Sequence, residues 1–178
     1  TAYWPFNGNA IDESGNGHNG IVNGATITAD RFNNEGAAYY FDGNDFIETL
    51  STFDFEERSI SLWVNPTRTD GVNPYNHVAF TQDGYELEYG LCRLDFDTNV
   101  LKLWAGGSDG TYSTENFETN TWHHYVLIRD ADSTYYYINN KLVYTSISDD
   151  YASTYDPNPQ FVIGSGRSTE LQFFEGYI

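Results

Sequence analysis

The sequence predicts an all-β fold, an antiparallel β-sandwich of two sheets, and three observations support this. The 178 residues include 15 Tyr, 12 Phe and 4 Trp but no Met, and aromatic side chains favour strands. Sixteen Gly and many Asn and Asp supply the positive-φ conformations that tight turns need. Short apolar or alternating segments recur with turn residues between them, which is the pattern of a sandwich.

The first four expected strands follow from short apolar segments. Residues 3–6 are mostly aromatic, and residues 21–27 form an apolar run that precedes a loop. Residues 37–41 and 46–50 stand on either side of an acidic turn, so they are expected to be neighbouring strands.

The fifth expected strand, residues 59–65, has the clearest pattern. Its side chains alternate between polar and apolar, and the alternation stops at Pro66. Because successive strand residues point to opposite faces, Ile60, Leu62 and Val64 are expected to share one buried face.

The middle of the chain predicts a meander. Residues 77–82, 85–96 and 100–105 are apolar segments separated by an Asp-Gly and an Asp-Thr-Asn turn. The only cysteine, Cys92, lies in the second of these and is interpreted as a small strand residue, since a single cysteine forms no disulfide within the chain.

The last part of the chain predicts a further hairpin. Residues 122–129 and 134–138 form a pair, and Asn139 and Asn140 then turn the chain because Asn tolerates positive φ. The strands that complete the set are 141–146, 160–164 and 171–178. The total is about twelve strands, with no internal repeat and no linker.

The charge balance argues against two classes of partner. Eight Lys and Arg against 26 Asp and Glu give a formal net charge of −18 at pH 7, which repels nucleic acid and anionic lipid headgroups. No apolar run is long enough to cross a bilayer. We therefore expect neither nucleic-acid binding nor membrane insertion. The acidity is typical of a solvated surface, with cation binding as the alternative explanation.

Both ends of the chain look abrupt. The first residues already resemble a strand and lack the basic-then-apolar pattern of a signal peptide, and the chain stops inside its last expected strand. We therefore expect a single domain over residues 1–178, excised from a larger protein.

The segment 12–20 alternates oxygen donors with glycines. Ca²⁺ takes six to eight oxygen ligands, so Asp12 and Asn16 with nearby carbonyls could supply part of a calcium site. The spacing is not that of an EF-hand, because Asn23 stands where the closing Glu is required. A turn held by Asx hydrogen bonds explains the segment equally well.

A second acidic turn contains Asp42 and Asp45. It is a second candidate for calcium, although a plain turn between two strands is the simpler interpretation. A separate set of aromatic residues at turns or loop centres could stack on the apolar faces of sugar rings, while others of the set pack internally. These candidates are Tyr75, Tyr85, Trp104, Tyr112, Tyr151 and Tyr155.

Catalytic patterns are weak. Glu86 and Glu88 share one strand face, as do Asp95 and Asp97, but paired acids on an exposed strand are more often solvated than catalytic. No catalytic triad pattern, phosphate loop or dinucleotide motif occurs. The histidines do not place two zinc ligands on one face. We expect no enzymatic activity.

The order of the motifs resembles the laminin G-like, concanavalin A-like sandwich family, especially its versions in large bacterial extracellular proteins. The matching segments are YWPFNGN (3–9), DESGNGH (12–18), AYYFDGNDFI (38–47), SISLWVNP (59–66), WHHYV (122–126), YINNKLV (137–143), FVIG (161–164) and FEGYI (174–178). Asn140 replaces the family's usual turn Gly. Members commonly continue with two acids and one more strand, which this chain lacks.

The resemblance implies a two-sheet jelly roll that binds carbohydrate or mediates adhesion, often with Ca²⁺. We therefore expect a non-catalytic module that binds a glycan or polysaccharide, within a larger secreted or cell-surface enzyme or adhesin. Its expected calcium ligands are Asp12, Asn16, Asp42 and Asp45. One alternative is a spacer or protein-binding domain that contacts a host or cell-surface protein. A polysaccharide hydrolase or lyase is a less favoured alternative.

Overall fold

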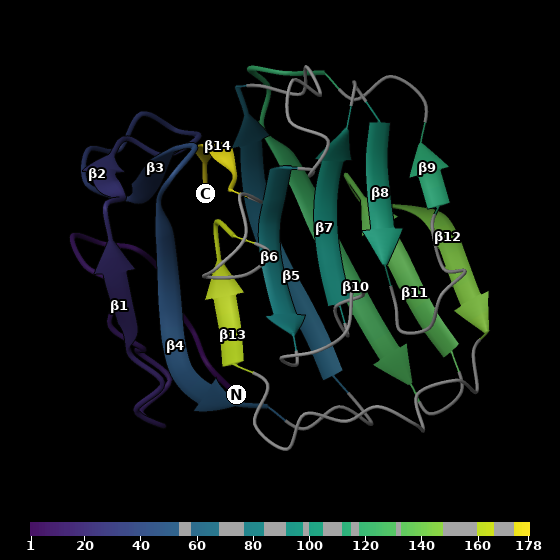
Figure 1. Ribbon diagram of the computed structural model, residues 1–178, viewed down its shortest axis with the longest axis horizontal. Helices are drawn as coiled ribbons and strands as arrows, with labels where there is room; N and C mark the ends of the chain where they lie inside the picture. Colours follow the sequence, from purple (N-terminus) through teal and green to yellow (C-terminus); the bar gives the residue numbers. More distant parts are fainter. Residues whose placement is uncertain are drawn as a thin grey trace.

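The computed structural model describes residues 1–53, 58–67, 77–83, 92–97, 100–104, 112–114, 118–130, 133–147, 160–165 and 173–178. This part of the chain contains strands, turns and irregular segments but no helix, so it also has no helix that could span a membrane. The strands form two seven-stranded antiparallel sheets (Figure 1). The predicted all-β sandwich is confirmed.

The first sheet has the strand order β1-β4-β13-β6-β7-β8-β9. Its strands are β1 (Gly20–Asn23), β4 (Phe46–Thr52), β13 (Gln160–Ile163), β6 (His77–Asp83), β7 (Cys92–Asp97), β8 (Val100–Trp104) and β9 (Tyr112–Thr114). The expected meander corresponds to β6, β7 and β8, which are neighbours in sequence and in the sheet. The short strand β9 was not predicted.

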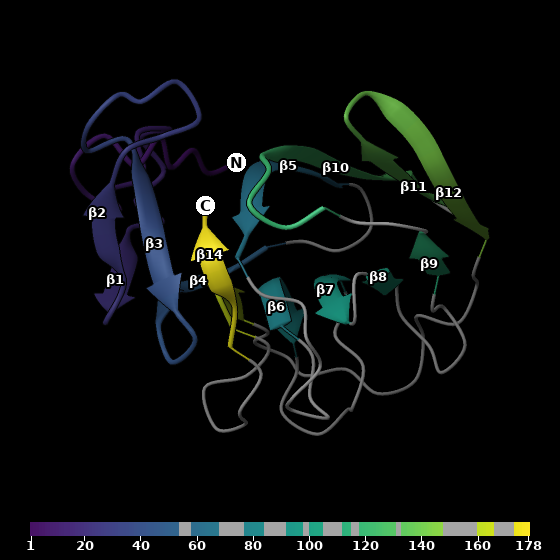
Figure 2. The same cartoon turned by 90° about the horizontal axis from the view of Figure 1, so that it is seen from above.

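The second sheet has the strand order β12-β11-β10-β5-β14-β3-β2. Its strands are β12 (Lys141–Ile147), β11 (Ser133–Ile138), β10 (His123–Asp130), β5 (Arg58–Pro66), β14 (Glu175–Tyr177), β3 (Ala38–Asp42) and β2 (Thr26–Thr28). In Figure 2, β5, β10 and β11 lie in one layer and β6, β7 and β8 in the other.

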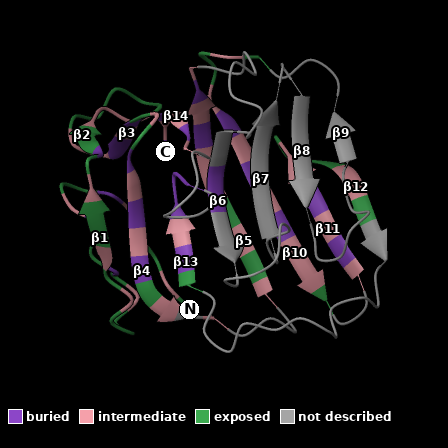
Figure 3. Cartoon of the chain, viewed as in Figure 1, coloured by how far each residue is buried: buried purple, intermediate pink, exposed green. Residues whose placement is uncertain are grey.

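Aromatic side chains fill the space between the sheets. The largest fully buried residues include Phe41, Phe80, Phe174, Tyr125 and Tyr136, which come from both sheets and from the segment before β14. Figure 3 shows the buried positions alternating along β10 and β11, as expected when one face of each strand covers a core. Part of the aromatic composition is therefore explained by this core.

Strand β5, which had the clearest pattern in the sequence, buries the face that was predicted to be buried. Val64 is buried, and Ile60 and Leu62 pack against the same core. The intervening residues Ser61 and Trp63 consequently lie on the opposite face of β5. This alternation gives the second sheet an outer face that carries large side chains.

Three predictions in the N-terminal part of the chain were wrong. Residues 37–41 and 46–50 are not neighbouring strands, because β3 lies in the second sheet and β4 in the first. Residues 3–6 are irregular, because Phe6 has φ 57° and Trp4 turns inward to stack on Phe161 at 5.8 Å. Residues 21–27 are not one strand, because the chain bends at Gly24, where φ is +87°. The bend places β1 in the first sheet and β2 in the second.

The expected strand 85–96 is described only from Cys92 onward, and this part is β7. Cys92 therefore lies in a strand, as predicted. Of the expected strand 171–178, residues 171–172 lie outside the described part, and among residues 173–178 the strand β14 covers Glu175–Tyr177. Tyr177 and its neighbours pair with both β3 and β5, which joins the two halves of the second sheet.

Candidate functional site

The outer face of the second sheet carries a row of partly exposed aromatic side chains. Phe41, Val64 and Tyr125 are buried, so the residue before each of them points away from the core. Cross-strand pairing then brings these outward residues together. We call the resulting set the outer aromatic row, and it consists of Tyr40, Trp63, Trp122, His124 and Tyr177.

The rings of the outer aromatic row contact one another in two groups. Trp63 and His124 are paired on β5 and β10, with ring centroids 4.8 Å apart and an interplanar angle of 16°. The ring centroid of Tyr177 lies 5.0 Å from that of Tyr40 and 6.2 Å from that of Trp122, and the rings are tilted to one another in both pairs. Partly exposed aromatic rings of this kind can stack on the apolar faces of sugar rings.

Polar atoms accompany the rings. The Ser61 hydroxyl lies 2.9 Å from His124 Nε2, within hydrogen-bond distance. Asn65, which pairs with Tyr177, has its Oδ1 buried without a hydrogen-bond partner among the described residues, and the same holds for Thr67 Oγ1. Buried polar atoms usually have a partner, but these two atoms are shielded from solvent, so the exposed Ser61 hydroxyl is the polar group that this face offers to a ligand.

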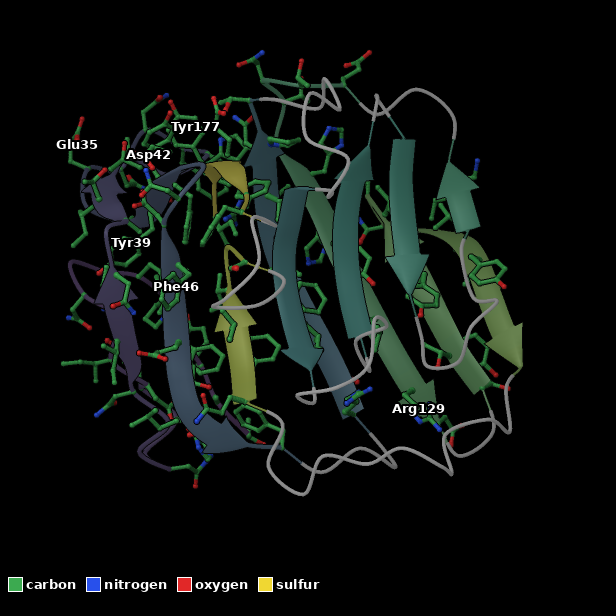
Figure 4. The ribbon with its side chains drawn as sticks, viewed as in Figure 1. Glu35, Tyr39, Asp42, Phe46, Arg129 and Tyr177 are labelled. Atoms are coloured by element: carbon green, nitrogen blue, oxygen red, sulfur yellow. The ribbon has the colours of Figure 1, made fainter. Side chains whose placement is uncertain are left out.

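The electrostatics of the row differ between its two ends. Burial lowers the pKa of His124, and the positive charge of Arg31 lowers it further, so the imidazole is neutral at pH 7. Burial raises the pKa of Tyr40, and the negative charge of Glu175 adds to the effect. Figure 4 shows Tyr177 at the same end of the molecule as Asp42. One end of the row therefore lies close to a cation and the other close to carboxylates.

Asp12, the first predicted calcium ligand, is occupied by the loop around it. Its Oδ1 accepts hydrogen bonds from the N–H groups of Tyr3 and Ser14, both at 2.9 Å. Its Oδ2 accepts from the Ser14 hydroxyl at 2.9 Å and from the His18 N–H at 3.0 Å. A carboxylate offers about four acceptor positions, so these bonds account for all of them.

This arrangement also controls the charge of Asp12. Burial alone would raise its pKa, but the donors from Tyr3, Ser14 and His18 outweigh burial and hold the pKa well below its usual range. Asn16 donates its amide to the Thr1 carbonyl at 2.8 Å and to the Ser14 hydroxyl at 3.1 Å. The hydrogen-bonded turn that was the alternative to calcium therefore accounts for the observed loop.

The second predicted turn holds a buried acid. Asp45 is buried, and its Oδ2 accepts a hydrogen bond of 3.0 Å from the Asp42 N–H. Burial raises the pKa of Asp45; the Asp42 N–H opposes this, and the negative charge of Asp42 adds to it. Gly24 lies directly against this carboxylate, because a Cβ at that position would overlap it. The turn thus combines two acids, one of them largely removed from water.

The two predicted calcium positions are far apart. His18, whose N–H donates to Asp12, also has its Nδ1 2.7 Å from the Ser51 hydroxyl near one end of β4, whereas Asp45 directly precedes the other end of β4. Six residues of strand separate Ser51 from Asp45, which corresponds to roughly 20 Å. The two positions therefore cannot form one site. No group of three or more His, Cys, Asp or Glu within the described ranges could hold a metal ion.

The predicted sugar-stacking residues fall mostly beyond the part of the chain that is described. Tyr75, Tyr85, Tyr151 and Tyr155 lie outside it, as do Glu86 and Glu88. Trp104 ends β8 and Tyr112 begins β9, but only their backbone is described. The outer aromatic row was not predicted, because most of its members lie on strand faces, whereas the predicted candidates stand at turns and loop centres. The alternation of residues 59–65 already implied that Trp63 points away from the core.

Comparison with known proteins identifies the family. The model of the concanavalin A-like lectin/glucanases superfamily matches residues 41–178. A search of curated protein sequences found no match.

Three solved structures share the fold. Domain 4 of AbnA, an extracellular arabinanase from Geobacillus stearothermophilus in complex with arabinotriose, has a TM-score of 0.64 and 22% identity over 99% of this chain and 87% of that one. Trypanosoma rangeli sialidase in complex with sialic acid has a TM-score of 0.71 and 14% identity, over 94% of this chain and 27% of the sialidase. The binding domain of Paraclostridial Mosquitocidal Protein 1 has a TM-score of 0.66 and 15% identity, over 93% of this chain and 42% of that one. This chain thus spans less than half of the latter two.

Proposed function

The chain belongs to the concanavalin A-like lectin/glucanases superfamily, and we propose on this basis that it is a non-catalytic carbohydrate-recognition module of a secreted or cell-surface protein. The similarity to an arabinanase domain in complex with arabinotriose, which extends over 99% of this chain, supports a glycan as the partner. That arabinanase is extracellular, which supports a secreted parent protein.

The observation that carries this proposal is the outer aromatic row. Apolar sugar faces stack on Tyr and Trp rings, and sugar hydroxyls require hydrogen-bond partners that replace water. The row offers both, since the exposed Ser61 hydroxyl lies 2.9 Å from His124 Nε2, beside the Trp63 ring. Strands β5, β10 and β14 hold these groups on a continuous sheet, so little ordering is required when a sugar binds.

Glycan binding is tested with a glycan array, followed by titration calorimetry on the best ligand. Tyr177→Ala should weaken binding roughly tenfold, as expected for the loss of about 1–1.5 kcal/mol of ring contact. Tyr3→Ala is the matched control, because this tyrosine is 58% exposed and lies outside the row. Silence across diverse glycans would favour the protein-binding alternative.

Absence of catalysis is tested on the same ligands. Incubation of the protein with each bound polysaccharide should release no new reducing ends and no unsaturated products. Either product would contradict the proposal: new reducing ends without unsaturation would indicate a hydrolase, and unsaturated products would indicate a lyase.

Calcium binding is a separate proposal, and we assign it to the turn with Asp42 and Asp45. The support is electrostatic, because a cation would offset the cost of burying the Asp45 carboxylate beside Asp42. Backbone carbonyls and water would have to supply the remaining ligands. The Asp12 loop is less suitable, since calcium there would have to displace existing hydrogen bonds.

The calcium proposal is tested with Asp45→Asn, which retains an oxygen acceptor for the Asp42 N–H. In calcium buffer the variant should melt at a lower temperature than the wild type, because a ligand that binds only the folded state stabilises it. With chelator the difference should vanish or reverse. Identical melting curves of the wild type with calcium and with chelator would refute calcium binding.

A further inference from the structure

We propose that Arg31 forms a carboxylate-binding subsite at the Trp63 end of the outer aromatic row, so that the preferred glycans are acidic ones containing uronic or sialic acid residues. The inference rests on the proposed glycan-binding function and names the class of glycan. It is drawn from the position of one loop, residues 29–37, which connects β2 to β3 and reaches over β5.

The loop is held in a defined shape by its own first acid. Asp30 Oδ1 accepts hydrogen bonds from the N–H groups of Phe32 at 2.8 Å and Asn34 at 2.9 Å, and Oδ2 accepts from the Asn34 amide at 3.1 Å. Burial would raise the pKa of Asp30, but these donors lower it, so the acid is ionised at neutral pH. The residues between these anchors, Arg31 and Phe32, are therefore presented in a fixed position.

Arg31 lies over two aromatic rings and forms no hydrogen bond or ion pair within the described residues, although its positive charge also helps to lower the pKa of the adjacent Asp30. Its guanidinium carbon lies 4.3 Å from the centroid of Trp63 and 4.3 Å from that of Phe32. Stacking uses the flat faces of a guanidinium and leaves its N–H donors, which lie in the plane, pointing outward. No carboxylate within the described ranges forms an ion pair with Arg31, and Figure 4 shows Glu35, from the same loop, pointing away from β5.

The charge context makes this position selective. The chain has eight basic residues against 26 acidic ones, so its surface as a whole repels carboxylates. Arg31 offers a planar pair of donors that matches the two oxygens of a carboxylate. His124 is neutral at pH 7 and adds no charge, but it stacks on Trp63 and fixes that ring beneath the guanidinium.

The neighbouring groups suit the rest of a sugar acid. Phe32 is 65% exposed and provides an apolar surface beside the guanidinium. The exposed Ser61 hydroxyl, next to His124, can exchange hydrogen bonds with sugar hydroxyls. An acidic peptide would satisfy Arg31 but would leave the stacking surface and the hydroxyl less well used, so we favour an acidic glycan.

The first experiment compares matched ligands on the intact chain. Trigalacturonate is titrated against its methyl ester, and 3′-sialyllactose against its methyl ester, at about 0.15 M salt. The loss of a charge-assisted bidentate contact corresponds to about a 10- to 100-fold change in affinity, so at least one acid should bind more tightly than its neutral partner by that factor. Equal affinity within both pairs would overturn the subsite while leaving general glycan recognition intact.

The second experiment changes the cation. Arg31→Gln should remove the preference for the acid, and Arg31→Lys should restore only part of it, because an ammonium cannot form the planar pair of contacts. Lys141→Gln is the control, since it removes one exposed positive charge three strands away from β5, roughly 14 Å across the sheet. An Arg31→Gln variant that keeps the wild-type preference would overturn the proposal.

A third readout needs no variant. Addition of 3′-sialyllactose or trigalacturonate should shift the indole N–H resonance of Trp63, while that of Trp4, which donates to the His18 carbonyl at 2.8 Å, should stay in place. If neither acid binds, or if hexaglutamate binds through Arg31 in their stead, the acidic-glycan subsite is refuted. The glycan array then decides the broader function by itself.

Discussion

At the scale of single residues, backbone conformation and buried acids determine where the chain tolerates change. Five non-glycine residues have positive φ in the described segments, and four of them are Asn. Asn adopts this conformation more readily than most residues, which is why turns at these positions need no glycine. Glycine is required where the left-handed conformation coincides with a crowded neighbour.

Gly164 is such a position, and Gly15 is its control. Both have φ +84°, but a Cβ on Gly164 would overlap the Phe41 ring in the core, whereas a Cβ on Gly15 would meet nothing within 4 Å. Gly164→Ala should therefore lower the free energy of unfolding by about 1–3 kcal/mol more than Gly15→Ala does. Urea unfolding measures the difference, and equal losses would contradict the crowding argument.

Asp12 should make stability depend on acidity. Its pKa in the folded protein is lower than in the unfolded chain, so its stabilising contribution is present above about pH 4 and is lost as the pH falls toward the folded value. Asp12→Asn should be less stable at pH 7 and should lose less stability on acidification through this window. Melting temperatures measured from pH 7 to pH 2 check this, and parallel curves would refute it.

At the scale of elements, pairing between strands is what assembles the site. Trp63 and His124 meet because β5 and β10 are in register, and Tyr40 and Tyr177 meet because β14 pairs with β3. The turn between β11 and β12 supports β10 as well, since Asn139 Oδ1 accepts a hydrogen bond of 2.9 Å from the His124 N–H. The turn therefore also holds the β10 backbone at His124.

The two residues of that turn should respond differently to substitution. Asn139 and Asn140 have φ 49° and 66°, as in a type I′ turn, in which Asn-Gly is favoured. Asn140→Gly should raise the free energy of unfolding by up to about 0.5–1 kcal/mol. Asn139→Gly should lower it by about 1–2 kcal/mol, because the hydrogen bonds to His124 and His123 are lost. Chemical denaturation of both variants tests the contrast; equal effects would be inconsistent with it.

At the scale of the whole molecule, the acidic charge opposes folding while the aromatic core favours it. The net charge of −18 is concentrated in a compact volume, and mutual repulsion destabilises the folded state more than the expanded chain. Screening by salt shortens the range of this repulsion. The aromatic core contributes independently of ionic strength at moderate salt.

Salt should therefore stabilise the protein. Raising NaCl from about 0.01 M to 0.5 M with chelator present should raise the melting temperature by roughly 2–4 °C or more, which corresponds to about 1 kcal/mol at this chain length. Differential scanning calorimetry provides the measurement. A melting temperature that falls with salt would mean that attractive ion pairs outweigh the repulsion.

The sequence by itself determined the fold class and most strands, because strand alternation and turn preferences act between residues that are close along the chain. Residues 59–65, the Asn139–Asn140 turn and the meander followed from these local rules. Local rules also place Trp63 on the face opposite Val64, although they do not reveal its partner.

Only the tertiary structure decided how distant segments meet. The division of residues 21–27 between two sheets at Gly24 and the position of Arg31 over Trp63 both depend on contacts between remote residues. Such contacts depend on which strands become neighbours and in which register. For this reason the type of fold was predictable, whereas the candidate site on the outer face of the second sheet was not.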